Sequence, residues 1–350
     1  MKKIGIITIN DNNNYGNRLQ NYAVQEVLKK MNLKVETIYN QKNAVIVRIK
    51  EKIKILIPLK KYNRLRCFNK FNKNIKFSNY FIDLNKIVND KIDKNYDNFF
   101  VGSDQVWNPN FDRMSLIDFL QFASKEKRNS FSASFGVSDI LEEKKEYAKK
   151  YLKEMNQISV REERAKIIVE ELTGRNDVNV LVDPTMLLDI EKWENVSQKP
   201  KQLKCEKYIL NYFLGELSEE RKKEINRIAE ENNCEIINIL DKEGKFYQTG
   251  PSEFLYLEKN AFLICTDSFH SSVFAILYNR PFIVFDREDN EAKMNSRINT
   301  LINKFDLKNR VFKGKITEDN LNHDYTEAYR ILALEREKAE LFLKKALELK

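Results

Sequence analysis

The strongest constraint on the fold is a repeated alternation of short β-type runs and longer helical patterns. The first forty residues show it: KKIGIITI is β-rich, NDNNNYGN is a polar loop, and a helical pattern then leads to the strand VETIY. Apolar side chains recur at near-helical spacing from Leu19 to Met31. This order is a βαβ unit, and such units build parallel sheets with right-handed crossovers.

The alternation runs to the C-terminus with one polar interruption. Residues 189–206 are polar and contain Pro200, which is typical of a domain boundary. A chain of 350 residues also exceeds one ordinary hydrophobic core. We therefore predict an α/β protein with an N-terminal domain over 1–190 and a C-terminal domain over 205–350. The long last helix, near 325–349, is expected to pack back on the N-terminal domain.

Two successive α/β halves predict two doubly wound, Rossmann-like domains that face each other across a cleft. In such sheets, ligands bind outside the carboxyl ends of the strands. The polar residues that could carry chemistry in this chain lie at such strand ends. The N-terminal half is expected to hold one substrate and the C-terminal half the other.

The sequence indicates a soluble cytoplasmic protein. The apolar run in MKKIGIITIN is too short for a secretory signal, and no run of about 18 apolar residues could span a membrane. The four cysteines form no CxxC pair, which favours buried thiols in a reducing compartment over disulfides or a zinc site. They are Cys67, Cys205, Cys234 and Cys265.

The positive charge of the chain is concentrated in residues 42–76. This segment holds twelve Lys and Arg residues and one acidic residue, whereas the rest of the chain holds 49 basic and 51 acidic residues. A general nucleic-acid partner is therefore not expected. Ile46, Ile49, Ile53 and Leu56 can share one helical face, so the segment could lie on the inner face of an anionic membrane. An ordinary solvated insert and a grip on a soluble polyanion are the alternatives.

The candidate site in the C-terminal half is the stretch ICTDSFHSSVF. His270 follows an apolar strand and falls in the first turn of the next helix, where free N–H groups and the helix dipole favour anions. The alternative is a packed or capping histidine. Asp267, Ser268 and Ser271 could contact a ligand, but capping of the helix is the commoner role of such residues.

Two further strand ends carry candidate residues. Arg161 ends ISVRE and suits a bidentate contact with a carboxylate or phosphate, although a surface ion pair is the commoner role. Arg297 is a weaker case of the same kind. Gly102, Ser103 and Asp104 follow the strand FFV, where a glycine allows close approach of a ligand. No dinucleotide, P-loop, metalloprotease or hydrolase motif occurs, so no metal or bound cofactor is expected.

Taken together, these stretches resemble the polysaccharide pyruvyl transferase family. The resemblance lies in the order of NYGNRLQNYA, FFVGSDQVWNP, SFSASFG, ISVREERA, VLVDPTMLL, CTDSFHSSVFAILYNRPFIVF and NSRINTL. It implies a GT-B-like fold and transfer of pyruvate from phosphoenolpyruvate, as a co-substrate, to a sugar, with formation of a ketal. The acceptor would be a glycan or lipid-linked sugar of a cell-surface polysaccharide.

The resemblance also suggests roles for individual residues. His270 would handle phosphate and a proton, Arg161 would hold the donor, and Asp104 would be a base for the acceptor hydroxyl. Ser268 and Ser271 would lie beside the donor, although many family members have arginine at the position of Ser268. Arg297 could supply that missing cation. Residues proposed for the acceptor side are Asn17, Arg18, Gln20 and Ser103.

Two other functions remain open at this stage. A glycosyltransferase of the same fold would use a nucleotide sugar and an acidic residue for the ribose, for which Glu288 or Asp289 could serve. A non-catalytic relative that binds a glycan or polyanion would have kept the fold and lost the chemistry, and Ser268 supports that alternative.

Overall fold

The structure is a computed structural model that describes residues 1–84, 91–111, 114–287 and 296–349. It divides into two compact units. Unit 1 comprises 1–62, 72–188 and 334–350, and unit 2 comprises 63–71 and 189–333.

Most strands and helices of unit 1 come from the N-terminal half of the chain. Its strands are β1 (Lys3–Ile7), β2 (Lys34–Gln41), β3 (Phe77–Asp83), β4 (Asn98–Val101), β5 (Arg128–Ser130), β6 (Ser159–Val160) and β7 (Asn179–Val180). Its helices are α1 (Tyr15–Lys30), α2 (Ala44–Leu56), α4 (Lys91–Lys94), α5 (Glu142–Leu152), α6 (Glu163–Thr173) and the C-terminal part of α13 (Thr326–Leu347).

Unit 2 repeats the alternation on a smaller scale. Its strands are β8 (Tyr208–Tyr212), β9 (Glu235–Asn238), β10 (Leu263–Thr266) and β11 (Phe282–Val284). Its helices are α3 (Asn63–Phe71), α7 (Ile190–Glu194), α8 (Glu219–Glu231), α9 (Pro251–Asn260), α10 (Phe269–Leu277), α11 (Ser296–Lys304), α12 (Glu318–Leu321) and the start of α13.

Both sheets are parallel, as the βαβ pattern predicts. The order in unit 1 is β3-β2-β1-β4-β5, and isolated parallel bridges continue it from β5 toward the β6–β7 pair. The order in unit 2 is β11-β10-β8-β9. Each order reverses once, between β1 and β4 in unit 1 and between β8 and β10 in unit 2. Such a reversal is a topological switch point, where doubly wound sheets bind ligands.

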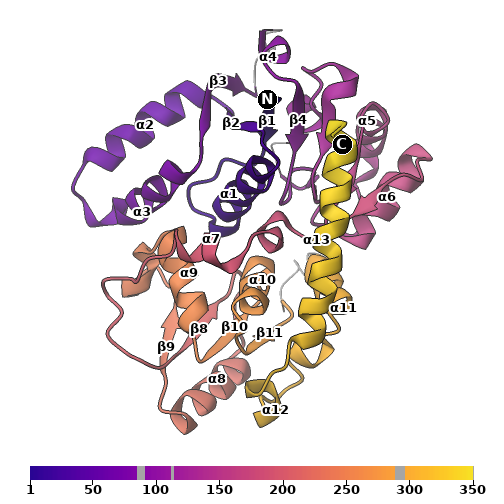
Figure 1. The fold of residues 1–350 in the computed structure, drawn as a ribbon. Coiled ribbons are helices and arrows are strands. Elements are labelled where there is room, and N and C mark those ends of the chain that lie inside the picture. Colours follow the sequence, from indigo (N-terminus) through magenta and orange to yellow (C-terminus); the bar gives the residue numbers. More distant parts are fainter. Residues whose placement is uncertain (85–90, 112–113, 288–295, 350) are drawn as a thin grey trace. The chain divides into compact units, whose positions relative to one another are not determined.

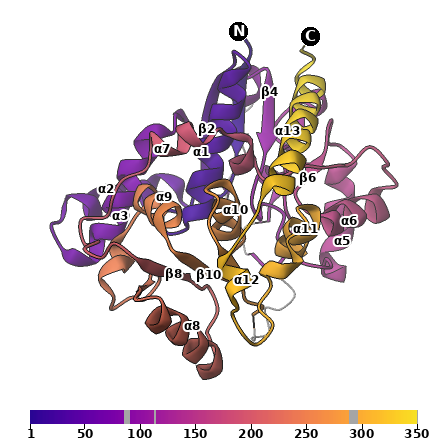
Figure 2. The ribbon, with the colours of Figure 1, turned by 60° about the horizontal axis from the view of Figure 1, so that its bottom comes forward.

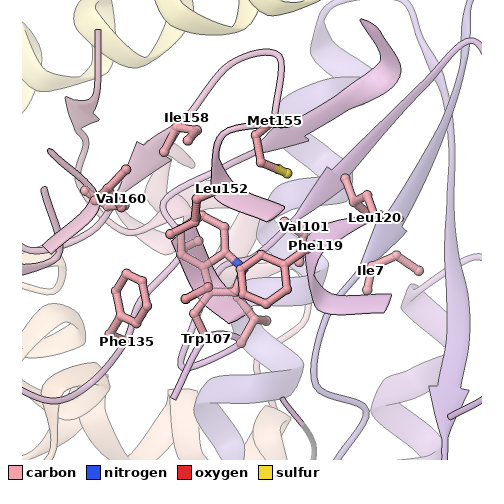
Figure 3. Packing of buried hydrophobic residues seen from close by; sticks show 14 of the residues in the cluster. Ile7, Val101, Trp107, Phe119, Leu120, Phe135, Leu152, Met155, Ile158 and Val160 are labelled. Carbon is pink, nitrogen blue, oxygen red and sulfur yellow. The ribbon is translucent and has the colours of Figure 1, made fainter. Parts of the chain in front are cut away.

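Large aromatic side chains fill the core of unit 1 (Figure 3). Trp107 stacks on Phe119 with ring centroids 5.9 Å apart, and its indole Nε1 donates to the carbonyl oxygen of Asp118 at 2.8 Å. Phe135 lies against the same indole at 5.4 Å. The indole N–H is therefore satisfied inside an apolar cluster, and the loop after β4 is anchored by its own side chain.

The C-terminal part of the last helix packs against the unit 1 sheet. Phe342, Leu343 and Leu347 of α13 pack with Ile4 and Ile6 of β1, so both chain termini lie at the same end of unit 1 (Figures 1 and 2). Burial of this apolar stripe explains why a helix at the far end of the sequence folds onto the first strand.

One segment departs from the predicted division. Helix α3 lies inside the basic stretch that we assigned to the N-terminal domain, but it packs in unit 2. Arg64 is buried and donates to the carbonyl oxygens of Tyr247 at 3.0 Å and Thr249 at 3.3 Å. A Cβ on Gly250 would lie 2.7 Å from Cys67 Cβ, so the absence of a side chain there lets α3 approach. Local pattern could not reveal this tertiary contact.

Some expected strands are shorter than the alternation suggests. The run RNSFSASFG forms a strand only over β5, and beyond it the parallel pairing continues as an isolated bridge between Ala133 and Val160. All four cysteines are free thiols, and Cys265 is buried. Among the described residues, no helix is both long and apolar enough to cross a membrane.

Candidate functional site

The switch point of unit 1 begins with a turn that only glycine fits. Gly102 follows β4 with φ of +128°, and a Cβ there would lie 2.3 Å from the carbonyl oxygen of Phe131. Asp104, two residues later, has a left-handed φ of +52°. Left-handed backbone at a non-glycine residue is uncommon and clusters at functional sites. The turn delivers the Asp104 side chain to the carboxyl end of the sheet.

A buried ion cluster occupies this position. Arg161 Nη1 lies 2.6 Å from Asp183 Oδ2, and its Nη2 lies 3.2 Å from Asp104 Oδ1. The side chains of Arg161, Asp183 and Asp104 are 1%, 0% and 6% exposed. Burial by itself would lower the pKa of Arg161, but the carboxylates of Asp183, Asp104 and Glu162 raise it. Arg161 is therefore a permanent cation between two carboxylates.

Hydrogen bonds tie this cluster to the start of α1. Asn17 Nδ2 donates to Asp104 Oδ2, and Gln20 Oε1 accepts from the Ser103 backbone N–H at 2.9 Å. Ser103 Oγ donates to Asp183 Oδ2 at 2.9 Å. The structure thus brings together five of the predicted residues: Asn17, Gln20, Ser103, Asp104 and Arg161. Their mutual bonds hold the Asp104 carboxylate in one orientation.

Arg18 does not share this cluster. Its Nη2 donates to the carbonyl oxygen of Ile9 at 2.7 Å, and the nearby charged groups are Asp11, Tyr39 and Glu51. Burial lowers the pKa of Arg18 to about 10, although these neighbours act in the opposite direction. Its contacts hold the polar loop that follows β1.

Two carboxylates of this site were not among the predicted site residues. Asp183 accepts from Thr185 N–H at 3.0 Å in addition to its ion pair. Glu162 Oε1 accepts from Ser134 Oγ at 2.8 Å and from the backbone N–H of Phe135 and Gly136. The signal for Asp183 was its place after the apolar run VLV and before a proline, which marks another strand end.

The switch point of unit 2 is organised by Asp267. Its carboxylate accepts from the backbone N–H of Leu214 at 2.7 Å and of Gly215 at 2.8 Å, and from Arg287 Nε at 3.1 Å. Burial raises the pKa of Asp267, while the two backbone bonds and Arg287 oppose that effect. Asp267 therefore joins the end of β10 to the loop after β8. It does not cap α10, which was the commoner role expected of it.

His270 lies in the first turn of α10, directly after β10, as the sequence predicts. It is 6% exposed, and its ring meets that of Phe269 edge to face with centroids 5.3 Å apart. Ser268 begins the helix without a capping hydrogen bond from its side chain, and its backbone N–H donates to Thr266 Oγ1 at 2.9 Å. A helix start at the carboxyl end of a parallel strand is a position that favours an anion.

Ser271 does not cap the helix either. Its hydroxyl donates to Glu258 Oε1 of α9 at 2.6 Å. Burial raises the pKa of Glu258 well above its usual value, and the bond from Ser271 offsets this only in part. Burial therefore favours the protonated form of the Glu258 carboxyl group, which contacts the first turn of α10 through Ser271.

Arg297 is the remaining predicted residue that the structure describes. Arg297 is buried in α11, which packs against α10. Glu288 and Asp289, the acidic residues considered for a ribose, lie outside the described residues. Within the described ranges, no group of three His, Cys, Asp or Glu side chains is arranged to hold a metal ion.

Comparison with known proteins identifies the family of this chain. The sequence pattern of the polysaccharide pyruvyl transferase family matches residues 14–290, which includes Asp104, Arg161 and His270. The chain belongs to the polysaccharide pyruvyl transferase family. Arg297 lies just beyond the matched range. No curated protein sequence matches this family member.

Solved structures that resemble this pyruvyl transferase family member include UDP-GlcNAc 2-epimerases. The enzyme from Methanocaldococcus jannaschii has 16% identity and a TM-score of 0.51, covering 95% of this chain and 99% of its own. The enzyme from Rickettsia bellii has 12% identity and a TM-score of 0.54, covering 99% and 97%. The Neisseria meningitidis enzyme, solved with UDP-GlcNAc, has 13% identity and a TM-score of 0.51, covering 100% and 95%. At these identities the likeness establishes the GT-B-like fold.

Proposed function

We propose that this protein transfers a pyruvyl group from phosphoenolpyruvate to two hydroxyls of a sugar in a cell-surface polysaccharide or its precursor. The observation that carries the proposal is the position of His270. It lies in the first turn of α10, at the switch point of unit 2 and inside the range matched by the family. A helix start at this position offers N–H groups to a phosphate, and an imidazole beside it can move a proton.

The reaction requires two proton transfers. The methylene carbon of phosphoenolpyruvate gains a proton, which leaves an oxocarbenium-like centre at C2. A sugar hydroxyl adds to C2, the C–O bond to phosphate breaks, and a second hydroxyl closes the ketal. Of the two protons lost by the hydroxyls, one balances the new methyl group and the other leaves on phosphate. We assign the donor phosphate and one proton transfer to His270, with Ser268 at the same helix start. The Ser271 hydroxyl is bonded to Glu258, so the donor contact first expected of it is replaced by a role in positioning the turn.

The ion cluster of unit 1 suggests a second part of the mechanism. Asp104 is held by Asn17 and Arg161, so its carboxylate has a fixed direction toward an acceptor hydroxyl. The family resemblance assigns Arg161 to the donor. Its ion pairs with Asp104 and Asp183 favour a positioning role instead, because a donor anion would have to replace one of them. These roles differ in outcome: loss of a donor contact weakens phosphoenolpyruvate binding, whereas loss of positioning lowers turnover at saturating donor.

The acceptor is proposed only as a class. A glycan or lipid-linked sugar would meet the unit 1 residues Asn17, Gln20 and Ser103 near Asp104, and Arg297 would add a cation for the donor. A peripheral position at an anionic membrane is part of the proposal, and helix α2 is the element that supports it.

A nucleotide sugar is the second candidate donor. The Neisseria meningitidis epimerase of the same fold was solved with UDP-GlcNAc, which favours this alternative over other ligands. A non-catalytic binding protein is the third candidate, since Ser268 replaces the arginine that the resemblance leads one to expect. The three candidates therefore differ in which ligand binds: phosphoenolpyruvate, a nucleotide sugar, or neither.

Calorimetric titration separates these candidates. Phosphoenolpyruvate, inorganic phosphate and UDP-GlcNAc are titrated in parallel into the wild-type protein and the His270→Ala variant. His323→Ala is the matched control, because His323 is the other histidine of the chain and its ring bonds the carbonyl oxygen of Asn279 at 2.9 Å. We expect saturable binding of phosphoenolpyruvate, a loss of at least about tenfold in His270→Ala and no change in His323→Ala.

The other outcomes are equally informative. Binding of UDP-GlcNAc without phosphoenolpyruvate would replace the donor with a nucleotide sugar. Binding of neither ligand to folded wild-type protein would leave the non-catalytic alternative. Equal binding by wild type and His270→Ala would remove His270 from the donor site.

A further inference from the structure

Helix α2 presents an unusual apolar face to solvent. Its exposed side chains recur at spacings of three and four residues and are between 53% and 82% exposed: Ile46, Ile49, Ile53 and Leu56. Val45 extends the same stripe and is 59% exposed. Isolated exposed apolar residues are ordinary, but a continuous stripe of five on one helix marks an interaction surface.

The opposite face of α2 fixes its orientation on unit 1. The Arg48 guanidinium lies over the ring of Phe81 in β3, 4.8 Å from the centroid, and 5.9 Å from that of Tyr39. Glu51, the single acidic residue of the helix, accepts from Asn12 Nδ2 at 3.0 Å. Helix α2 therefore packs on β2 and β3 through its polar side, next to β3 in Figure 1, and turns its apolar side outward.

Lysines border the apolar stripe on both sides. At about 100° per residue, Lys50 and Lys54 fall beyond one edge of the stripe and Lys52 beyond the other. All three are exposed, and none of them makes an ion pair with any residue that the structure describes. Lys60 and Lys61 lie shortly after the end of α2 in the sequence and are exposed as well.

We propose that α2 lies flat in the surface of an anionic lipid bilayer, with its isoleucine stripe between the acyl chains and its lysines at the headgroups. An apolar stripe with lysines on its flanks is the pattern of an interfacial helix. A second copy of this chain fits less well, because the same lysines would face one another across a two-fold interface. A soluble polyanion would use the lysines but would leave the apolar stripe in water. This inference does not rest on the proposed transferase reaction.

Vesicle flotation tests the proposal on the full-length protein. The probes are vesicles of pure phosphatidylcholine and of phosphatidylcholine with about one third phosphatidylglycerol. The variants are Ile49→Asn/Ile53→Asn, which removes the centre of the stripe, and Lys50→Gln/Lys54→Gln, which removes two charges. The matched controls are Leu341→Asn, an exposed leucine of α13, and Lys222→Gln/Lys223→Gln, two exposed lysines of α8.

We expect wild-type protein and both controls to bind only the anionic vesicles. Each lysine near such a surface contributes about fivefold, so the lysine pair should lower binding by about 25-fold. The isoleucine pair should lower it by at least about tenfold, since these side chains leave water only in the bound state. Flotation of the isoleucine variant at the wild-type level overturns the proposal. Loss in the lysine variant alone would indicate a polyanion-binding surface instead.

Fluorescence quenching measures the depth of the helix. Both native tryptophans, Trp107 and Trp193, are buried, so they contribute a background that lipid does not reach. In Ile53→Trp, lipids brominated near the headgroup end of the acyl chain should quench the new tryptophan more than lipids brominated near the chain end. Leu341→Trp should show no quenching. A wild-type dimer in lipid-free solution that Ile49→Asn/Ile53→Asn dissociates would identify a second copy as the occupant and overturn the proposal.

Discussion

The ion cluster of unit 1 and Glu258 of unit 2 hold their buried carboxyl groups in opposite ways. In unit 1, Asp104 and Asp183 are charged and share the guanidinium of Arg161. In unit 2, Glu258 is equally buried, yet among the described residues its hydrogen-bond partner is the Ser271 hydroxyl and no cation contacts it. A buried carboxylate needs a cation or several N–H donors, and without them it takes up a proton.

The two sites therefore differ in how their buried carboxyl groups are held. In unit 1 the guanidinium of Arg161 pairs with two carboxylates before any ligand binds. The start of α10 in unit 2 carries His270 directly after β10, and a helix start at the end of a parallel strand favours an anion. The chain also exits differently: β4 ends in a turn that requires glycine, whereas β10 ends in Asp267 and Ser268 with ordinary backbone angles.

Replacement of Arg161 should have the largest effect. Arg161→Met leaves two buried carboxylates without their cation, and the free energy of unfolding should fall by about 3–5 kcal/mol. Urea denaturation measures this loss. The control is Arg330→Met, which removes an exposed ion pair with Glu327 on α13. Loss of such a surface pair should leave the urea midpoint unchanged. If both variants unfold at the wild-type midpoint, the cluster does not hold unit 1 together.

A pair of glycines with positive φ tests why the exit of β4 requires glycine. Gly102→Ala combines a strained backbone with a Cβ that meets the Phe131 carbonyl, and it should cost about 3 kcal/mol. Gly174→Ala has a similar positive φ of +73° but no atom within 4 Å of the new Cβ, so it should cost about 1 kcal/mol. Thermal unfolding of the two variants compares them. Equal costs would mean that backbone strain alone, and no close packing, sets the requirement at Gly102.

The smallest effect concerns the pH dependence of stability. The folded protein keeps the proton on Glu258 at pH values where the unfolded chain, with a pKa near 4.5, has released it. Stability should therefore fall as pH rises above about 4.5, by at most about 1.4 kcal/mol per pH unit, until the folded pKa is reached. Glu258→Gln should lose this slope. Glu220→Gln on α8, an exposed control, should keep it.

Ser271→Ala sharpens the same test. Its hydroxyl bond lowers the pKa of Glu258, so its removal should extend the falling limb to higher pH. Urea denaturation across a pH series detects the extension. A profile identical to that of wild type would show that the hydroxyl does not set the protonation of Glu258.

Much of the fold was predictable because it rests on local pattern. Helix α10 begins within a residue of the predicted start, and the chain divides at Leu188–Asp189, next to the polar stretch that we took as the boundary. The placement of α3 was not predictable. In the sequence, Arg64 and Phe68 belong to a basic segment, and only the structure shows that they pack in unit 2. Sequence likewise placed Arg161 and Asp104 at strand ends without revealing that each is the partner of the other.

By itself, the sequence determined the alternation of strands and helices, the strand-end positions of the polar residues and the concentration of positive charge in one segment. These follow from periodicity and composition, which act over a few residues. Tertiary structure decided which carboxyl groups are charged, because that depends on whether a cation such as Arg161 comes within hydrogen-bond distance. It also decided which face of α2 is exposed, because Arg48 and Glu51 bond to unit 1 and turn the isoleucines outward. Both outcomes depend on residues distant in sequence, whose proximity only the packed fold creates.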